Sequence, residues 1–329
     1  MKNKWKVLFV LLVTCVFSFQ VSGQVEAPQE TRNAALRYWM AFARLQDVSV
    51  DAKTKDLLEK ALAEPTAWDD KKLGPIVDEN MEAIETMQRA TKLPDCDWGL
   101  EYSRGPRMQL QIDGHASRAL ARLNILYGMR SVAKGDSQKA ADTWIAGIRF
   151  SQDIARGGSL LATLVGNSVL LQDLRAVTEA TEKGAFNAEQ RRRLAVAVKA
   201  LPETGFDWAQ AFWYESFALG VVLREMREAK DPAAYYKEIM GEPAPANWTP
   251  PTAAETAAFH KLMVSVQSAL RLNPSEAKEK LKNLQSSVSS LNPFFREATP
   301  SFEKTNAARI ELQSMRETTL RALGTPVGK

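Results

Sequence analysis

Apolar residues recur at helical spacing along almost the whole chain, and this feature limits the possible folds most. Alternation of apolar and polar residues, which is typical of half-buried strands, is almost absent. The pattern predicts an all-α protein, an irregular multi-helix array or bundle of antiparallel helical hairpins. The predicted helices are 31–46, 51–63, 69–92, 107–133, 136–156, 159–183, 187–201, 207–229, 232–240, 253–272, 274–290 and 300–323.

Capping residues support these boundaries. Asn273, Pro274 and Glu276 place a cap, a first-turn proline and a first-turn acid in the order that begins a helix. Thr299 before Pro300 repeats the cap and the proline. Asp97 and Asp207 each precede a tryptophan, and both are predicted to start a helix by accepting orphan amide hydrogens. The helix 159–183 is apolar on most sides, so we expect it to be the most covered.

The segment 241–251 contains four prolines, which exclude a helix and favour an extended linker. The sequence therefore predicts a main helical domain at 24–240. A C-terminal three-helix segment follows at 252–329, which we expect to pack on the main domain.

The first 23 residues have the features of a signal peptide. Lysines at positions 2, 4 and 6 precede an apolar run at 7–19, and small residues at 21–23 suit cleavage by signal peptidase. The run is too short to span a bilayer of about 30 Å as a helix. We predict a periplasmic or secreted protein with no stable membrane insertion after cleavage.

Cleavage would leave a nearly neutral chain. The full sequence has 43 basic and 39 acidic residues, and the segment 1–23 holds three lysines and no acid, which leaves 40 against 39. This balance gives no support for a nucleic-acid partner. Cys96 would be the only cysteine, so it is either a small buried residue or a reactive or intermolecular thiol.

Residues 121–154 resemble a single tetratricopeptide-type hairpin with its turn at 134–136. Its small residues and its aromatic stand where two helices approach closely: Gly128, Ala140, Trp144 and Gly147. Asn124 and Gln152 depart from the repeat, at an aromatic and a proline position. The resemblance implies peptide binding in a concave groove. The stretch 96–106 leading into 116–123 is similar to uncharacterised exported helical bacterial proteins, which implies no activity.

Motifs of common enzyme classes are missing. The chain has two histidines, His115 and His260, and no haem-attachment, zinc-protease, di-iron, dinucleotide, Walker or nucleophile-elbow motif. Cys96 with His115 is the only nucleophile–base pair that can be named, and nothing marks an oxyanion hole beside it. The sequence predicts no catalytic residue, no metal site and no cofactor.

Glu215 is the most unusual polar residue because it lies on an apolar helical seam. The rest of that seam is Phe212, Leu219, Val222 and Met226. A carboxylate there needs a partner or a proton. The candidate partners are Arg118, Arg122, Arg149 and Arg175. An internal ion pair that sets helix register is the favoured interpretation, and the wall of a ligand cavity is the alternative.

Four further residues have two interpretations each. Asn167 either bonds between helices or lines a pocket, and His115 is either a satisfied imidazole or a ligand. Trp213 and Tyr214 belong either to the core or to an exposed patch that would contact a peptide or glycan. With Glu215 and Arg118, these four are the tentative ligand-binding residues.

Two functions follow from these features. The first is an exported, non-catalytic interaction or scaffold protein that binds a peptide or a partner protein. The alternative is a small-molecule or glycan-binding protein, or a hydrolase, with a pocket around Glu215. A glycosidase usually needs two carboxylates, and only one is in view. The sequence leaves the oligomeric state open.

Overall fold

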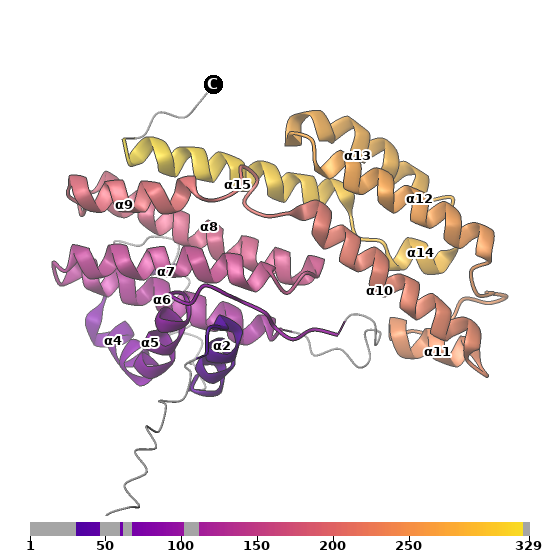
Figure 1. The fold of residues 1–329 in the computed structure, drawn as a ribbon, viewed down its shortest axis with the longest axis horizontal. Helices are drawn as coiled ribbons and strands as arrows, with labels where there is room; N and C mark the ends of the chain where they lie inside the picture. Colours follow the sequence, from indigo (N-terminus) through magenta and orange to yellow (C-terminus); the bar gives the residue numbers. More distant parts are fainter. Residues whose placement is uncertain (1–30, 47–59, 62–67, 102–111, 325–329) are drawn as a thin grey trace, which may run out of the picture. The chain divides into compact units, whose positions relative to one another are not determined.

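A computed structural model describes residues 31–46, 60–61, 68–101 and 112–324, and within these ranges every regular element is a helix (Figure 1). The only strand-like feature there is an isolated bridge between Asn33 and Asp95. The all-α prediction is confirmed. The predicted signal peptide and most of the predicted helix 51–63 lie outside the described residues.

Three long consecutive helices form the centre of the unit 33–329. They are α6 (Gly114–Ala133), α7 (Ser137–Ala155) and α8 (Leu160–Glu182), and short turns make neighbours antiparallel. The helix α8 packs against α6, α7 and two later helices, α10 (Trp208–Glu228) and α15 (Phe302–Ala322). Among the described helices, α8 alone has the length and apolar composition to cross a membrane. Because 72% of its most apolar window is buried in the fold, α8 has the burial of a core helix, as predicted.

The predicted helix 69–92 is two helices, α4 (Asp70–Glu79) and α5 (Met81–Ala90). They meet at Asn80, which is 1% exposed. Its side chain donates to the carbonyl of Ile76 and accepts from the backbone N–H of Gln46. These bonds replace helical ones, so the chain can turn without leaving buried polar groups unpaired. The first of the described helices, α2 (Ala34–Ala43), is shorter than the predicted 31–46.

Four helices carry the chain from the core towards its C-terminal part. The first, α9 (Ala188–Lys199), is followed by α10 (Trp208–Glu228), whose first amides are capped by Asp207 as predicted. The third and fourth are α11 (Pro232–Met240) and α12 (Ala253–Leu270). Between α11 and α12 the chain is non-helical, and Trp248 packs on Tyr236 with ring centroids 4.7 Å apart.

The last part contains one helix more than predicted. After α13 (Pro274–Val288), a short α14 (Pro293–Ala298) precedes α15 (Phe302–Ala322). Asn292 and Pro293 begin α14 with the same cap and proline that begin α13. The prediction that Thr299 starts the last helix is wrong, because Thr299 ends α14 and Ser301 caps α15. The helix start predicted at Asp97 is also wrong, since residues 96–101 form no helix.

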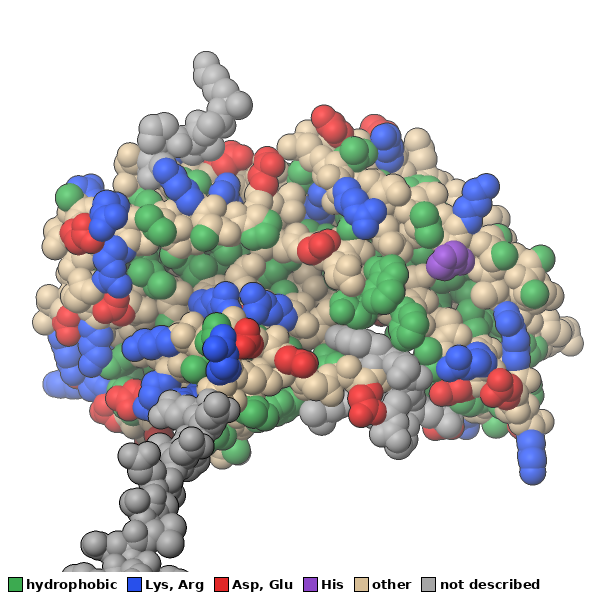
Figure 2. All heavy atoms as spheres, viewed as in Figure 1, with side chains coloured by type: hydrophobic (Ala, Val, Ile, Leu, Met, Phe, Trp, Pro, Cys, Tyr) green, Lys and Arg blue, Asp and Glu red, His purple; other side chains and the backbone are tan. Residues whose placement is uncertain are grey.

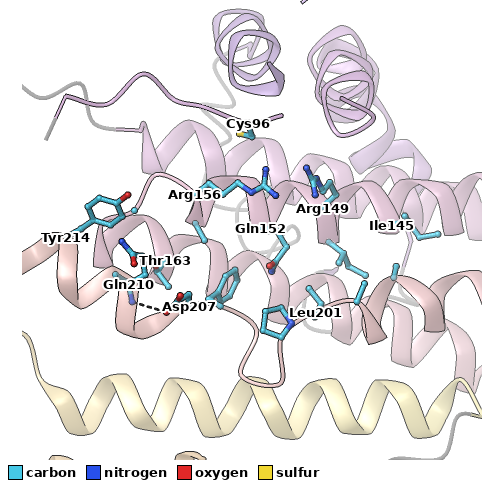
Figure 3. Close-up of a pocket in the computed structure, with 18 residues that line it drawn as sticks. Cys96, Ile145, Arg149, Gln152, Arg156, Thr163, Leu201, Asp207, Gln210 and Tyr214 are labelled. Carbon is cyan, nitrogen blue, oxygen red and sulfur yellow. Dashed lines mark hydrogen bonds between the residues drawn. The ribbon is translucent and has the colours of Figure 1, made fainter. Parts of the chain in front are cut away.

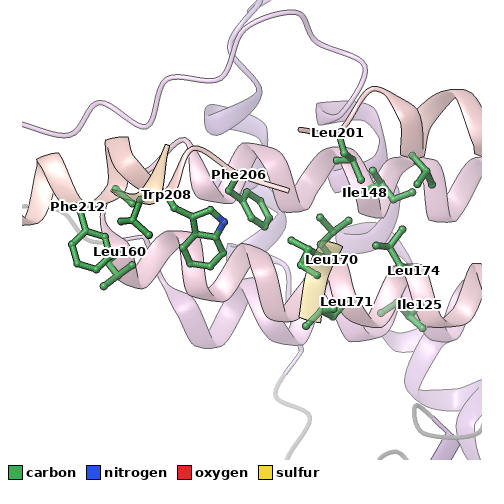
Figure 4. Packing of buried hydrophobic residues seen from close by; sticks show 14 of the residues in the cluster. Ile125, Ile148, Leu160, Leu170, Leu171, Leu174, Leu201, Phe206, Trp208 and Phe212 are labelled. Carbon is green, nitrogen blue, oxygen red and sulfur yellow. The ribbon is translucent and has the colours of Figure 1, made fainter. Parts of the chain in front are cut away.

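Close packing in the core explains the small residues of the α6–α7 hairpin. A Cβ atom at Gly128 would lie 2.5 Å from Nε1 of Trp144, so only glycine admits that indole. Beside it, side chains of α8 interdigitate with those of neighbouring helices (Figure 4). Leu170 and Leu174 are completely buried there.

A second apolar cluster lies between α2, α5, α6, α7 and α8. Tyr38 of α2 packs on Phe150 of α7 and on Trp98, with centroids 4.9 and 5.6 Å apart. Trp98 therefore contributes to this core from an extended segment rather than from a helix. The cluster surrounds one acidic side chain, Asp153.

Candidate functional site

A groove of about 710 Å³ lies between α7 and the junction of α9 with α10 (Figure 3). Its α7 wall includes Ile145, Arg149, Gln152 and Arg156, and its opposite wall includes Leu201, Asp207, Gln210 and Tyr214. Ile148, Leu201 and Phe206 are buried hydrophobic residues that contribute to the lining. The groove thus combines apolar side chains with charged and amide groups.

Two arginines mark the α7 wall. Arg149 and Arg156 have side chains 33% and 45% exposed. In the view of Figure 2, basic side chains gather over α7 beside hydrophobic ones. Their charge is partly balanced, because Asp207 lines the opposite wall. The groove therefore offers guanidinium N–H donors without a strong net field.

Asp153 forms ion pairs with both arginines from a buried position. This side chain is completely buried, and its carboxylate lies 3.2 Å from Nε of Arg149 and 3.7 Å from Nη1 of Arg156. The hydroxyl of Tyr38 donates to the same carboxylate at 2.7 Å. Burial raises the pKa of Asp153, while the Tyr38 hydrogen bond and the two arginines oppose that rise. Arg149 and Asp153 of α7 and its C-cap residue Arg156 thus form one cluster, in which the acid orients two cations at the groove.

Cys96 also lines the groove, but its thiol is protonated. Burial, together with the nearby Asp153 charge, raises the pKa of Cys96 to about 12. The thiol donates to the carbonyl of Asp153 at 3.8 Å. A thiolate nucleophile is therefore disfavoured here.

Glu215 pairs with none of the four arginines considered from the sequence. Its carboxylate accepts a hydrogen bond of 2.8 Å from the backbone N–H of Leu160, at the N-terminus of α8. Among the described residues, no arginine lies within ion-pair distance of it; Arg149 pairs with Asp153, and Arg175 pairs with Glu311. Burial raises the pKa of Glu215, and the Leu160 hydrogen bond opposes the rise. Glu215 is a tertiary cap of a core helix.

The other tentative binding residues do not converge on one site. Tyr214 lines the groove, whereas Trp213 is 44% exposed and lies on another face of α10. His115 is exposed and Arg118 is half-buried, both on α6. Asn167 is buried in α8, where its Oδ1 has no hydrogen-bond partner among the described residues.

Sequence reasoning missed Arg149, Asp153 and Arg156 as a unit. The signal was present, because an acid between two arginines at helical spacing can pair with both. What the sequence could not show is the aromatic cover over Asp153. Tyr38 and Trp98, which provide it, are more than 50 residues away along the chain.

The described residues contain no group of three His, Cys, Asp or Glu side chains that could hold a metal ion. No protein-family model, curated protein or solved structure matches the chain significantly. Its fold and site define the class only as an all-α protein of packed helices with an open groove.

Proposed function

We propose that the chain is an exported, non-catalytic interaction protein that binds a peptide or a peptide segment of a partner protein in the α7–α10 groove. The observation that carries the proposal is the pair of arginines, Arg149 and Arg156, held beside an apolar lining by the buried Asp153. Side chains fixed before binding lose less conformational freedom when a ligand arrives.

The lining indicates what kind of segment would fit. Ile148, Leu201 and Phe206 would contact an apolar side chain, and a carboxylate would accept hydrogen bonds from the guanidinium groups. Gln152 and Gln210 add amide groups suited to a peptide backbone. The groove is open rather than enclosed, as a segment of a longer chain requires.

The resemblance of residues 121–154 to a tetratricopeptide-type hairpin supports the same proposal. The second helix of that hairpin is α7, which supplies one wall of the groove. In such repeats, peptides bind on surfaces built from helical hairpins.

Site-specific crosslinking tests the proposal. A photoreactive amino acid replaces Gln210, an exposed residue of the groove, in the full chain expressed in its native host. The same substitution at Glu279, an exposed residue of α13, is the matched control. We expect a reproducible adduct from position 210 alone. Equal adducts at both positions, or none at position 210, would overturn the proposal.

Two further variants separate binding from folding. Arg156→Gln keeps a polar side chain on the rim and is expected to weaken the adduct while the helical circular dichroism signal remains. Glu215→Gln is expected to lower stability and to leave the adduct unchanged, because Glu215 caps α8. Loss of the adduct in a stably folded Glu215→Gln variant would favour the alternative pocket around that residue.

A further inference from the structure

A second groove of about 320 Å³ lies between α10 and α12. It is lined by Trp213, Ser216, Phe217, Gly220, Val221, Arg224 and His260. Trp213 and Phe217 are 44% and 41% exposed, and their rings stack with centroids 5.6 Å apart. In the view of Figure 2, exposed hydrophobic side chains gather over α10. Two large aromatic side chains thus remain partly in water on a helix whose other face is core.

Gly220 keeps this groove open. A Cβ atom at this position would meet no atom within 4 Å, and the residue lies inside α10 without a positive φ. Neither close packing nor backbone conformation therefore requires glycine. Glycine is also among the least favourable residues in a helix interior. Glycine at position 220 therefore lowers the stability of α10. Its other physical effect is to leave an open surface between Phe217 and Arg224.

The polar side chains of the groove favour an anion. Arg224 supplies a positive charge and His260 an imidazole ring, and no acidic side chain lines the groove. Neither residue forms an ion pair within the described part of the chain, and both are exposed. The groove therefore complements a ligand that joins a flat apolar group to an anion. This character differs from that of the α7–α10 groove, which has Asp207 in its wall.

We propose that the α10–α12 groove binds an acidic peptide segment, with a large apolar side chain against Trp213 and Phe217 and a neighbouring carboxylate on Arg224 and His260. The peptide nature of the occupant rests on the proposed function. The two grooves adjoin along α10, because the rings of Tyr214 and Trp213 lie 5.0 Å apart and each lines one groove. A single partner chain could therefore contact both.

Fluorine NMR of the full protein tests this inference. The protein is labelled with 5-fluorotryptophan, and Trp213→Phe identifies the resonance of residue 213 among the eight tryptophans. The probes are acetyl-Ala-Phe-Asp-Glu-amide and its neutral counterpart acetyl-Ala-Phe-Asn-Gln-amide. We expect the acidic peptide to shift the Trp213 resonance to saturation and the neutral peptide to bind about three- to fivefold more weakly. Arg224→Gln should remove that difference.

Gly220→Leu provides the decisive variant, because a Cβ atom at this position meets no atom within 4 Å and the rest of a leucine side chain would occupy the groove. We expect this variant to lose the acidic-peptide shift while its thermal midpoint stays equal or rises. Ala257→Leu, which also places a leucine at an exposed helical position but on α12 and outside the groove, should bind as the parent does. A stable Gly220→Leu protein that still binds, or a parent with no preference for the acidic peptide, would overturn the inference. Crosslinking at Gln210 reports on the other groove, so failure of one proposal is distinguishable from failure of the other.

Discussion

Two buried aspartates on neighbouring core helices show how differently the same side chain can be accommodated. Asp153 of α7 and Asp173 of α8 both have no exposed surface. Asp153 accepts from Tyr38 and lies beside Arg149 and Arg156. Within the described residues, neither carboxylate oxygen of Asp173 has a hydrogen-bond partner.

The two environments act differently on the pKa of each carboxyl group. Burial raises the pKa of Asp173 well above its ordinary value, and nothing opposes it. Burial also raises the pKa of Asp153, but the Tyr38 hydroxyl and the arginines favour its charged form. Asp173 is therefore expected to be a neutral acid packed against Gly147, where a Cβ atom would lie 2.4 Å from its Oδ1. Asp153 instead lies beside two arginines that line the groove proposed to bind a peptide.

The largest effect is expected from removing the partnered acid. Asp153→Ala leaves the buried Tyr38 hydroxyl without its acceptor and the two arginines without their anchor. We expect the free energy of unfolding to fall by about 3 kcal/mol. This value is at the lower end of the range for broken buried ion pairs, because both arginines reach solvent. Urea unfolding at pH 7 measures this loss. A change of less than about 1 kcal/mol would show that the cluster does not stabilise the fold.

Replacing the unpartnered acid with a side chain that cannot ionise should change the pH dependence instead. Above about pH 4 the unfolded chain ionises Asp173 while the folded chain keeps it protonated. The folding free energy of the parent therefore becomes less favourable by up to about 1.4 kcal/mol per pH unit, until the pH reaches the raised folded pKa. Asp173→Asn cannot ionise, so it should lack this part of the slope.

Paired urea titrations of the parent and Asp173→Asn from pH 4.5 to 8 measure the difference. Glu215 also has a raised pKa and adds a slope of the same sign, but it is present in both proteins. Identical pH profiles would mean that Asp173 ionises normally in the folded state.

Gly147→Ala tests whether the space for Asp173 is tight. The new methyl group would overlap the carboxyl group, which has to move within a packed core. We expect a loss of about 1–3 kcal/mol. Combining Gly147→Ala with Asp173→Ala should recover part of it, since the double variant removes the clashing atoms. If the losses of unfolding free energy in the two single variants simply add in the double variant, the strain does not arise from contact between residues 147 and 173.

Tyr38→Phe is expected to give the smallest effect of this series. It removes the hydroxyl that donates to Asp153 and keeps the ring packed on Phe150. We expect the free energy of unfolding to fall by about 1.5 kcal/mol, as for the loss of a hydrogen bond to a charged acceptor. The same variant should further raise the pKa of Asp153, which a pH series of unfolding experiments would detect. An unchanged stability would show that solvent or the arginines replace the bond.

Local sequence signals predicted the helices well and their interruptions poorly. Asp207 and Asn273 cap helices as expected because a cap needs only the next few residues. Asn80 breaks a helix because its side chain bonds to the backbone of Gln46, which lies beyond the end of α2 and 34 residues away along the chain. Asp97 carries a cap signal without a helix, since Trp98 is held in the core by a hydrogen bond to the carbonyl of Asp153.

The site was less predictable than the fold. Glu215 was correctly singled out as a costly carboxylate, but its partner is a backbone amide of α8 rather than an arginine. Almost every residue has a backbone N–H, so the sequence does not indicate which one a side chain will bond. No sequence pattern could therefore predict Leu160 as the partner of Glu215. The α10–α12 groove depends on Gly220 and His260, which lie 40 residues apart along the chain and meet only through helix packing.

Periodicity and small residues determined the helical class and the tight contact of Gly128 with Trp144, because both depend on side-chain volume and spacing within a hairpin. Tertiary structure decided which acid is partnered, which helix end Glu215 caps and where open grooves remain. Those outcomes depend on groups brought together across the chain, and their energies arise from desolvation and distance rather than from residue type.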